Sequence, residues 1–234
     1  MGNEILSMIL AQISTAQDTV STAIESTTDS VRIIDLLFQG GFMMIPILIL
    51  SIMAVYIFVE RVLTINKAAK TPEQFIDRIK GLVEKGDISA AKLLCQQHDS
   101  PVSRMIEKGI ERIGSPLKNI EVSIENVGKI EIFKLEKNLS LLATISGSAP
   151  MLGFLGTVIG MIQAFIAIAQ EEGSVSPKLL SEGIYTAMIT TATGLFVGII
   201  AYLGYNYLVT RVQKVVHKME YSSIEFVDLL QEPQ

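Results

Sequence analysis

Charged and reactive residues are scarce in this sequence of 234 residues, and their scarcity excludes several kinds of protein. It has one cysteine, two histidines, no tryptophan and only 18% charged residues. The single Cys95 cannot form an internal disulfide, and the histidines form no cluster with metal-ligand spacing, so we expect no metal and no cofactor. No nucleophile is paired with a base, so we expect no enzyme, and we interpret Cys95 with His98 as a structural helix end.

Two further absences concern the partners of the chain. The net charge is −5, and no basic patch is interleaved with aromatic residues, which argues against nucleic acid. No glycine-rich stretch has the spacing of a phosphate-binding loop. The sequence therefore does not predict a nucleotide-binding or nucleic-acid-binding protein.

What the sequence has instead is apolar length, with a mean hydropathy of +0.44. Three windows, 36–59, 138–170 and 183–210, contain no charged residue. Each exceeds the roughly 20 residues that a membrane-spanning helix needs. The apolar stretch 5–13 is too short to span and has no preceding Lys or Arg, so we interpret it as retained rather than as a signal peptide. We expect a protein that crosses the membrane three times and contacts membrane lipids.

The basic residues predict an orientation, because Lys and Arg near spans favour the cytoplasm. Fourteen of the nineteen lie between the first and second windows. The N-terminus is then outside and the C-terminus inside. The predicted parts are an outer amphipathic N-terminal segment or mobile tail (1–35), transmembrane helix 1 (36–59), a cytoplasmic helical domain (60–137), transmembrane helix 2 (138–170), an outer loop (171–182), transmembrane helix 3 (183–210) and a cytoplasmic tail helix (211–234).

Helix signals rather than strand alternation mark the charged segments. The expected helix starts and breaks are Thr71-Pro72-Glu73-Gln74, Gly86-Asp87, Ser100-Pro101, Gly114-Ser115-Pro116 and Ser176-Pro177. After Pro116 we expect one long helix that runs into the second span, and the third helix is expected to continue past Thr210. The predicted fold class is all-α, with three transmembrane helices of which the second and third are long and extend into the cytoplasm, where small helices pack on them.

Small residues line one face of the second and third windows. On the second they include Pro150, Gly153, Thr157 and Gly160, and on the third Thr191, Gly194 and Gly198; Gly156 with Gly160 and Gly194 with Gly198 have GxxxG spacing. Small faces let helices approach closely in lipid. One interpretation is that both faces are packing seams. The other is a hydroxyl-lined wall, to which Thr186, Thr190 and Thr193 add further hydroxyls. The first span lacks such a face and is expected to lie at the periphery of the bundle, where it faces lipid.

No Asp, Glu, Lys, Arg or His lies within any of the three windows. Such groups are the usual carriers of protons across membranes. If the chain conducts protons, a partner must supply the titrating group.

Residues 149–160, APMLGFLGTVIG, and residues 183–195, GIYTAMITTATGL, closely resemble the signature of the ExbB/TolQ branch of the MotA/TolQ/ExbB proton-channel family, and are most like ExbB. The resemblance implies a channel-forming stator subunit of a bacterial inner-membrane motor, with the outer side facing the periplasm. It implies a homopentamer around an ExbD-like or TolR-like single-span partner whose intramembrane aspartate titrates, and energy transfer to a TonB-like protein for outer-membrane nutrient import.

The same resemblance assigns site residues. Thr157 and Thr191 fall on the two threonines that face the pore in the family, while many members have a glutamate at the position of Thr186. Two alternatives remain, a TolQ-type subunit for envelope integrity and a passive membrane scaffold whose small faces only pack. A MotA-type flagellar stator fits less well because those have four spans.

Overall fold

The computed structural model describes residues 40–70, 74–170 and 177–231. Within these ranges the chain folds into helices and contains no strand, which confirms the all-α prediction. The helices are α3 (Met44–Ala68), α4 (Phe75–Glu84), α5 (Ile88–Gln97), α6 (Pro101–Ile110), α7 (Leu117–Glu136), α8 (Leu139–Gln170) and α9 (Pro177–Gln231). The segment 1–35, Thr71 to Glu73 of the expected capping box and the loop residues 171–176 lie outside the described residues.

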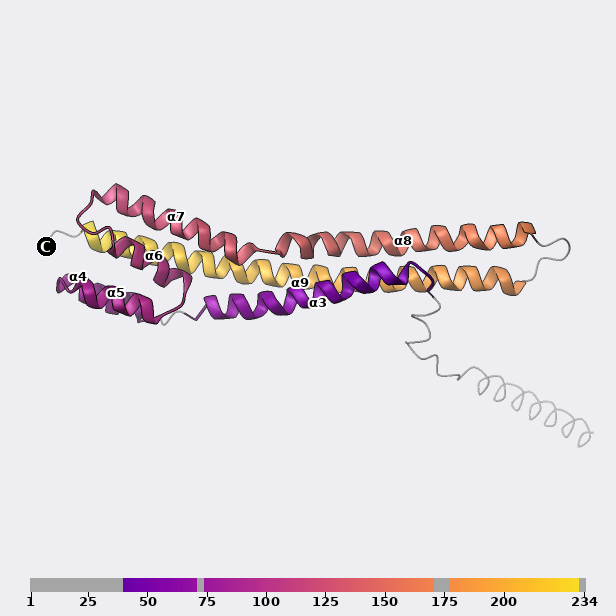
Figure 1. Cartoon of the computed structure of the whole chain (residues 1–234), viewed down its shortest axis with the longest axis horizontal. Coiled ribbons are helices and arrows are strands. Elements are labelled where there is room, and N and C mark those ends of the chain that lie inside the picture. The colour runs from indigo at the N-terminus through magenta and orange to yellow at the C-terminus, as the bar shows by residue number, and fades with distance from the viewer. Residues whose placement is uncertain (1–39, 71–73, 171–176, 232–234) are drawn as a thin grey trace, which may run out of the picture.

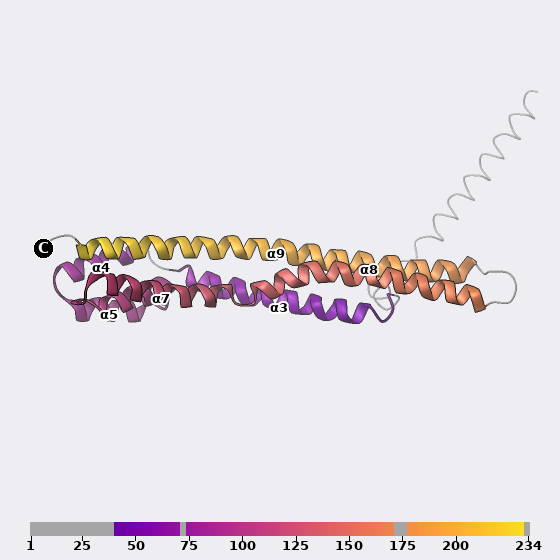
Figure 2. The same cartoon turned by 90° about the horizontal axis from the view of Figure 1, so that it is seen from above.

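The long helices lie side by side along one axis (Figures 1 and 2). The line α7–α8 runs antiparallel to α9, α3 packs beside them, and α4, α5 and α6 gather at the end that holds the C-terminus. Among the residues that the structure describes, three helical stretches are long and apolar enough to cross a membrane: Met44–Ala68, Leu117–Gln170 and Gly183–Gln231. The predicted number of spans is therefore confirmed.

The longest element is α9, an unbroken helix of 55 residues. At 1.5 Å per residue it is about 80 Å long, more than twice the roughly 30 Å hydrocarbon core of a bilayer. It packs against α3, α4, α6, α7 and α8. The third helix thus continues past Thr210, and α9 is the central helix against which these other helices pack.

Two predicted helix starts are capped as their sequences indicate. The Asp87 side chain accepts a hydrogen bond from the backbone N–H of Ala90, and Ser100 caps α6 through the N–H of Ser103, with Pro101 in the first turn. Gly86 ends α4 with φ of 72°, a left-handed conformation that glycine adopts without steric cost. Local sequence therefore sets the boundaries of the small helices.

The prediction of one continuous helix from Pro116 into the second span is wrong. α7 ends at Glu136 and α8 begins at Leu139, because Asn138 adopts a left-handed conformation with φ of 64°. Asparagine is among the few residues other than glycine that visit this region routinely. The break exposes helix-terminal carbonyls that need donors.

Arg61 on α3 supplies such donors. Its guanidinium donates to the carbonyl of Lys134 at 2.9 Å and lies 3.5 Å from that of Leu135. Arg61 is only 3% exposed, and its charge is paired with the neighbouring Glu60. The first helix therefore extends beyond Val59, and its charged end is built into the junction between α7 and α8.

Candidate functional site

The closest helix packing in the structure lies between α8 and α9. The residues of α8 that are buried along it are Ala149, Gly153, Gly156, Gly160 and Ala164. A Cβ added at Gly194 of α9 would lie 2.6 Å from the carbonyl oxygen of Ala149 and 2.8 Å from the Cα of Gly153. Only glycine permits this approach, since the opposing atoms belong to the backbone.

The other small residues predicted from the sequence lie along the same seam. A Cβ on Gly198 would meet the ring of Pro150 at 2.5 Å, one on Gly160 would lie 3.1 Å from the Cβ of Ala187, and one on Gly156 would overlap the side chain of Thr190. Pro150, Gly153, Gly156, Gly160, Gly194 and Gly198 are thus all placed at or beside the interface of α8 and α9.

Thr191 joins the two helices directly. Its hydroxyl donates to the carbonyl of Gly153 at 3.0 Å, across the seam. Polar side chains commonly form such bonds between helices in membranes. The Thr191 hydroxyl, which the family resemblance assigns to the pore wall, therefore donates its proton to a hydrogen bond within one chain.

Thr157 lies beside the seam, half-buried. Its hydroxyl donates to the carbonyl of Phe154 on its own helix at 2.6 Å, the back-bonded arrangement usual for threonine in helices. The structure does not bring Thr157 into a hydrogen bond with Thr191. Of the two, only Thr191 makes a hydrogen bond between α8 and α9, whereas the hydroxyl of Thr157 bonds within α8.

Thr186 and Thr190 hold the residues that precede α3. Thr190 is 1% exposed, and its single hydroxyl proton is shared between the carbonyls of Thr186 at 2.8 Å and Gly40 at 3.1 Å. Gly41 lies next to the methyl group of Thr186 and has φ of 68°. In the single chain these two threonines therefore tie the beginning of α3 to α9.

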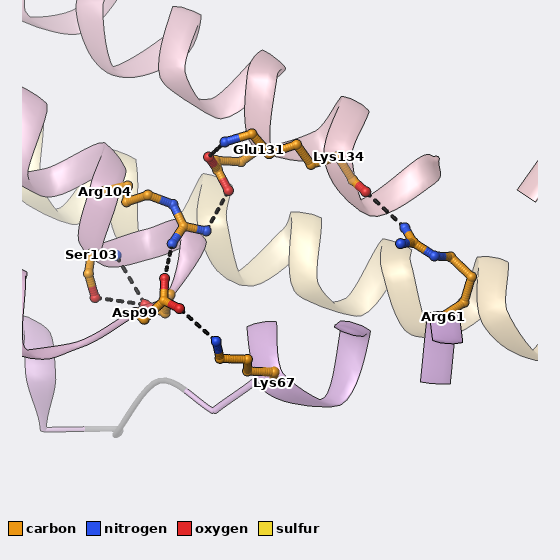
Figure 3. A network of polar contacts seen from close by, with 8 residues as sticks. Arg61, Lys67, Asp99, Ser103, Arg104, Glu131 and Lys134 are labelled. Atoms are coloured by element: carbon orange, nitrogen blue, oxygen red, sulfur yellow. Dashed lines mark hydrogen bonds and ion pairs between the residues drawn. The ribbon is translucent and has the colours of Figure 1, made fainter. Parts of the chain in front are cut away.

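A second polar cluster joins α3, α6 and α7 at the other end of the bundle (Figure 3). Glu131 on α7 is 3% exposed and accepts hydrogen bonds from Arg104 on α6 at 2.6 Å and from Lys134 at 2.7 Å. Asp99 also pairs with Arg104 and accepts a bond from Lys67 at the end of α3 at 2.8 Å. The cluster thus fixes the small helices to the end of the first span.

Electrostatics within this cluster favour the charged forms. Burial by itself would raise the pKa of Glu131, but the hydrogen bonds from Arg104 and Lys134 outweigh burial and lower it below the usual value. The hydrogen bond from Lys67 and the nearby charges of Lys67 and Arg104 likewise lower the pKa of Asp99. The sequence does not identify these residues as a cluster, because no local pattern indicates which charges meet across helices.

The surroundings of Cys95 and His98 are those of residues that pack within the fold. Cys95 is buried, and burial with the nearby charge of Glu107 raises the pKa of its thiol to about 12. The His98 ring packs edge-on against Phe75 with centroids 5.5 Å apart. A thiol with this pKa stays protonated at neutral pH and is a poor nucleophile. Over the described ranges, no three His, Cys, Asp or Glu side chains are grouped so as to hold a metal ion.

Three apolar helices and a glycine-lined seam that bears threonine hydroxyls define a multi-pass α-helical membrane protein. Residues 97–221, which include α6 to α8, match the MotA/TolQ/ExbB proton channel family. The chain belongs to this family.

Curated relatives have names consistent with this membership. A biopolymer transport protein ExbB homolog from Methanothermobacter thermautotrophicus is 30% identical over 190 residues, which cover 80% of this chain and 67% of the relative. The biopolymer transport protein ExbB of Aquifex aeolicus is 38% identical over 108 residues, covering 45% and 70%. The Tol-Pal system protein TolQ of Haemophilus influenzae is 38% identical over 85 residues, covering 36% and 37%.

Proposed function

We propose that the chain is the channel-forming stator subunit of a proton-driven motor in a bacterial inner membrane. In this proposal it assembles as a homopentamer around an ExbD-like partner and transmits the proton motive force to a TonB-like protein that serves outer-membrane nutrient import. The N-terminus faces the periplasm, and the charged end of the bundle, with α4, α5 and α6, faces the cytoplasm.

The observation that carries the proposal is the absence of Asp, Glu, Lys, Arg and His from the three apolar windows of a proton-channel family member. Protons cross membranes on groups that titrate or on ordered water, and this chain supplies no carboxylate, amine, guanidinium or imidazole there. A single-span partner with an intramembrane aspartate would complete the path. Because Thr191 is engaged with Gly153, we assign the larger part of the wall to Thr157.

The surface of the single chain is suited to assembly. Large apolar side chains of α8 and α9 are exposed, among them Met151, Phe154, Phe165, Met188 and Phe196. Lipid covers part of such a surface, and copies of the chain or the partner helix cover the rest. The names of the relatives described above, two ExbB and one TolQ, support a motor subunit of this kind.

Proton flux in liposomes tests the proposal. The chain is reconstituted with a co-expressed single-span partner, and a pH-sensitive dye records proton uptake under an imposed membrane potential. We expect flux with the partner, none when the partner aspartate is changed to asparagine, and a reduction of about tenfold or more for Thr157→Val. Thr144→Val is the matched control, because the Thr144 hydroxyl also bonds to a carbonyl of its own helix, that of Ser140. Thr144 lies before the family motif at residues 149–160.

Two alternatives give different results. A passive scaffold predicts that Thr157→Val and Thr144→Val leave both flux and outer-membrane uptake intact while the complex still assembles. A TolQ-type subunit, favoured by the similarity to the Haemophilus influenzae protein, predicts normal flux together with loss of envelope integrity rather than of nutrient import when the gene is deleted.

A further inference from the structure

A pocket of about 190 Å³ lies where the end of α3 meets α6 and α9. Its apolar lining comes from the end of α3, from Val102 of α6 and from Val215 of α9; the residues at the end of α3 are Ile65, Ala68 and Ala69. Its charged lining consists of three cations of α9, Arg211, Lys214 and Lys218. These cations are spaced by three and four residues, so they share one face of the helix. None of the described residues that line the pocket is acidic.

The polar cluster around Glu131, which lies nearby, has a different balance of charge. There Lys67, Arg104 and Lys134 face the carboxylates of Asp99 and Glu131, which balance most of the positive charge. In the α9 pocket, Arg211 and Lys214 lie together with no acidic residue among the described residues that line it. Its lining therefore favours an anion.

The pocket lies at the end of the apolar part of the bundle. Arg211 is the first charged residue after the window 183–210, and its guanidinium lies 3.4 Å from the side-chain oxygen of Asn66 on α3. Arg211 also donates to the hydroxyl of Tyr207 at 3.1 Å and lies over its ring. Arginine and tyrosine at such a level are typical of the boundary between lipid tails and head groups.

An apolar cavity of about 230 Å³ lies further along the same two helices, towards the membrane centre. It is lined by Phe58 of α3 and Gly204 of α9, seven residues before Ile65 and Arg211 in their respective helices. Seven residues are close to two helical turns, so both hollows lie on the same stripe of each helix, about 10 Å apart. A charged pocket followed by an apolar hollow is the shape of a head group followed by its acyl chain.

We propose that this pocket binds the head group of an anionic phospholipid, with an acyl chain in the apolar cavity between α3 and α9. Basic pockets between transmembrane helices recognise lipid phosphates through the charge of Lys and Arg. The bound lipid would brace the end of α3 against α9 at the membrane surface.

Lipid retention by the purified full-length protein tests the proposal. The detergent-solubilised protein is mixed with vesicles of equal parts dioleoylphosphatidylglycerol and dioleoylphosphatidylcholine, repurified and analysed by native mass spectrometry. We expect the wild-type protein to retain the anionic lipid preferentially. Lys214→Gln should lower that preference about fivefold and Arg211→Gln/Lys214→Gln about thirtyfold, because each basic residue near an anionic surface contributes about 1 kcal/mol.

The matched control is Lys118→Gln/Lys129→Gln, which removes two charges from α7 and should leave retention unchanged. Inorganic phosphate at 10 mM should not displace the lipid, because phosphate gains nothing from the apolar cavity. Equal retention of both lipids by the wild-type protein overturns the proposal, and so does complete displacement by phosphate. Unchanged lipid retention with an altered oligomer mass in the double variant would assign the pocket to a second copy of the chain and overturn it as well.

Discussion

The hydroxyl of Thr191 on α9 donates a 3.0 Å hydrogen bond to the carbonyl of Gly153 on α8. The bond crosses the seam where glycines of both helices let the backbones approach. Because Gly153 lacks a side chain, its carbonyl is accessible to the threonine. A family position expected to face the pore therefore also contributes to the packing of the two helices.

Replacing Thr191 separates these roles. Thr191→Val keeps the shape but loses the hydrogen bond, and should lower the free energy of unfolding in detergent by about 1 kcal/mol, whereas Thr191→Ser should retain most of it. Thr193→Val is the control, because the Thr193 hydroxyl bonds to the Ile189 carbonyl of its own helix. Denaturant titration measures all three, and equal losses for Thr191→Val and Thr193→Val would contradict the bond across the seam.

Gly194 should not tolerate even one added methyl group. In Gly194→Ala the new Cβ would lie 2.6 Å from the Ala149 carbonyl oxygen and 2.8 Å from the Gly153 Cα, so the helices must move apart. We expect a loss of about 2 kcal/mol in the free energy of unfolding.

Gly147→Ala is the matched control on α8, because a Cβ there meets nothing within 4 Å. Alanine should be neutral or stabilising by up to about 1 kcal/mol at that exposed helical position. Thermal unfolding in detergent compares the two variants. A Gly194→Ala protein as stable as Gly147→Ala would show that the seam is looser than the structure indicates.

The buried carboxylate of Glu131 should stabilise the packing of α6 against α7 in a pH-dependent way. Its pKa is lower in the folded protein than in the unfolded chain, so its contribution is present in full above the unfolded value of about 4.3 and disappears as the pH falls through the folded value. Glu131→Gln should cost about 2 kcal/mol at pH 7, because Arg104 and Lys134 lose a charged partner.

The control for that change is Glu125→Gln on the same helix. Glu125 pairs with Lys129 across one turn, and both side chains are well exposed, so the cost should stay below about 0.5 kcal/mol. Unfolding measured from pH 7 down to pH 3 should show a shallower loss of stability for Glu131→Gln than for the wild-type protein. Parallel pH profiles would disprove the role of this carboxylate.

The left-handed conformation of Asn138 makes a further prediction. Asn138→Gly should be tolerated, because glycine adopts φ of 64° without strain. Asn138→Val should cost about 1 to 2 kcal/mol, or straighten the α7–α8 line and pull the Lys134 carbonyl away from Arg61. Denaturant titration gives the cost, and a valine variant as stable as the glycine variant would contradict the assigned conformation.

Sequence alone predicts much of this fold, because its signals are local or periodic. Asp87 and Ser100 cap helices where expected, and each charge-free window overlaps a helix able to span a membrane. The sequence does not indicate the break at Asn138, because the apolar period continues through it. Asparagine tolerates the left-handed conformation but does not require it, so only the tertiary contact from Arg61 makes the break evident.

The sequence predicts which residues form the candidate site better than it predicts how they are arranged. The small residues of the two helices do lie at their interface, but the buried line on α8 runs through Ala149, Gly153, Gly156 and Gly160 and leaves Thr157 beside it. A step of three or four residues leaves the exact line undetermined, and the neighbouring helix decides it. Glu131 and Arg104 pair from positions 27 residues apart, which no local pattern encodes.

The unbroken course of α9 has a mechanical consequence. A rod about 80 Å long that tilts by about 5° moves its far end by about 7 Å. The antiparallel line of α7 and α8 is interrupted at Asn138, so it can bend there, whereas α9 must move as a whole. A small rearrangement among the transmembrane helices would therefore reach the distal end of the bundle as a large displacement carried by α9.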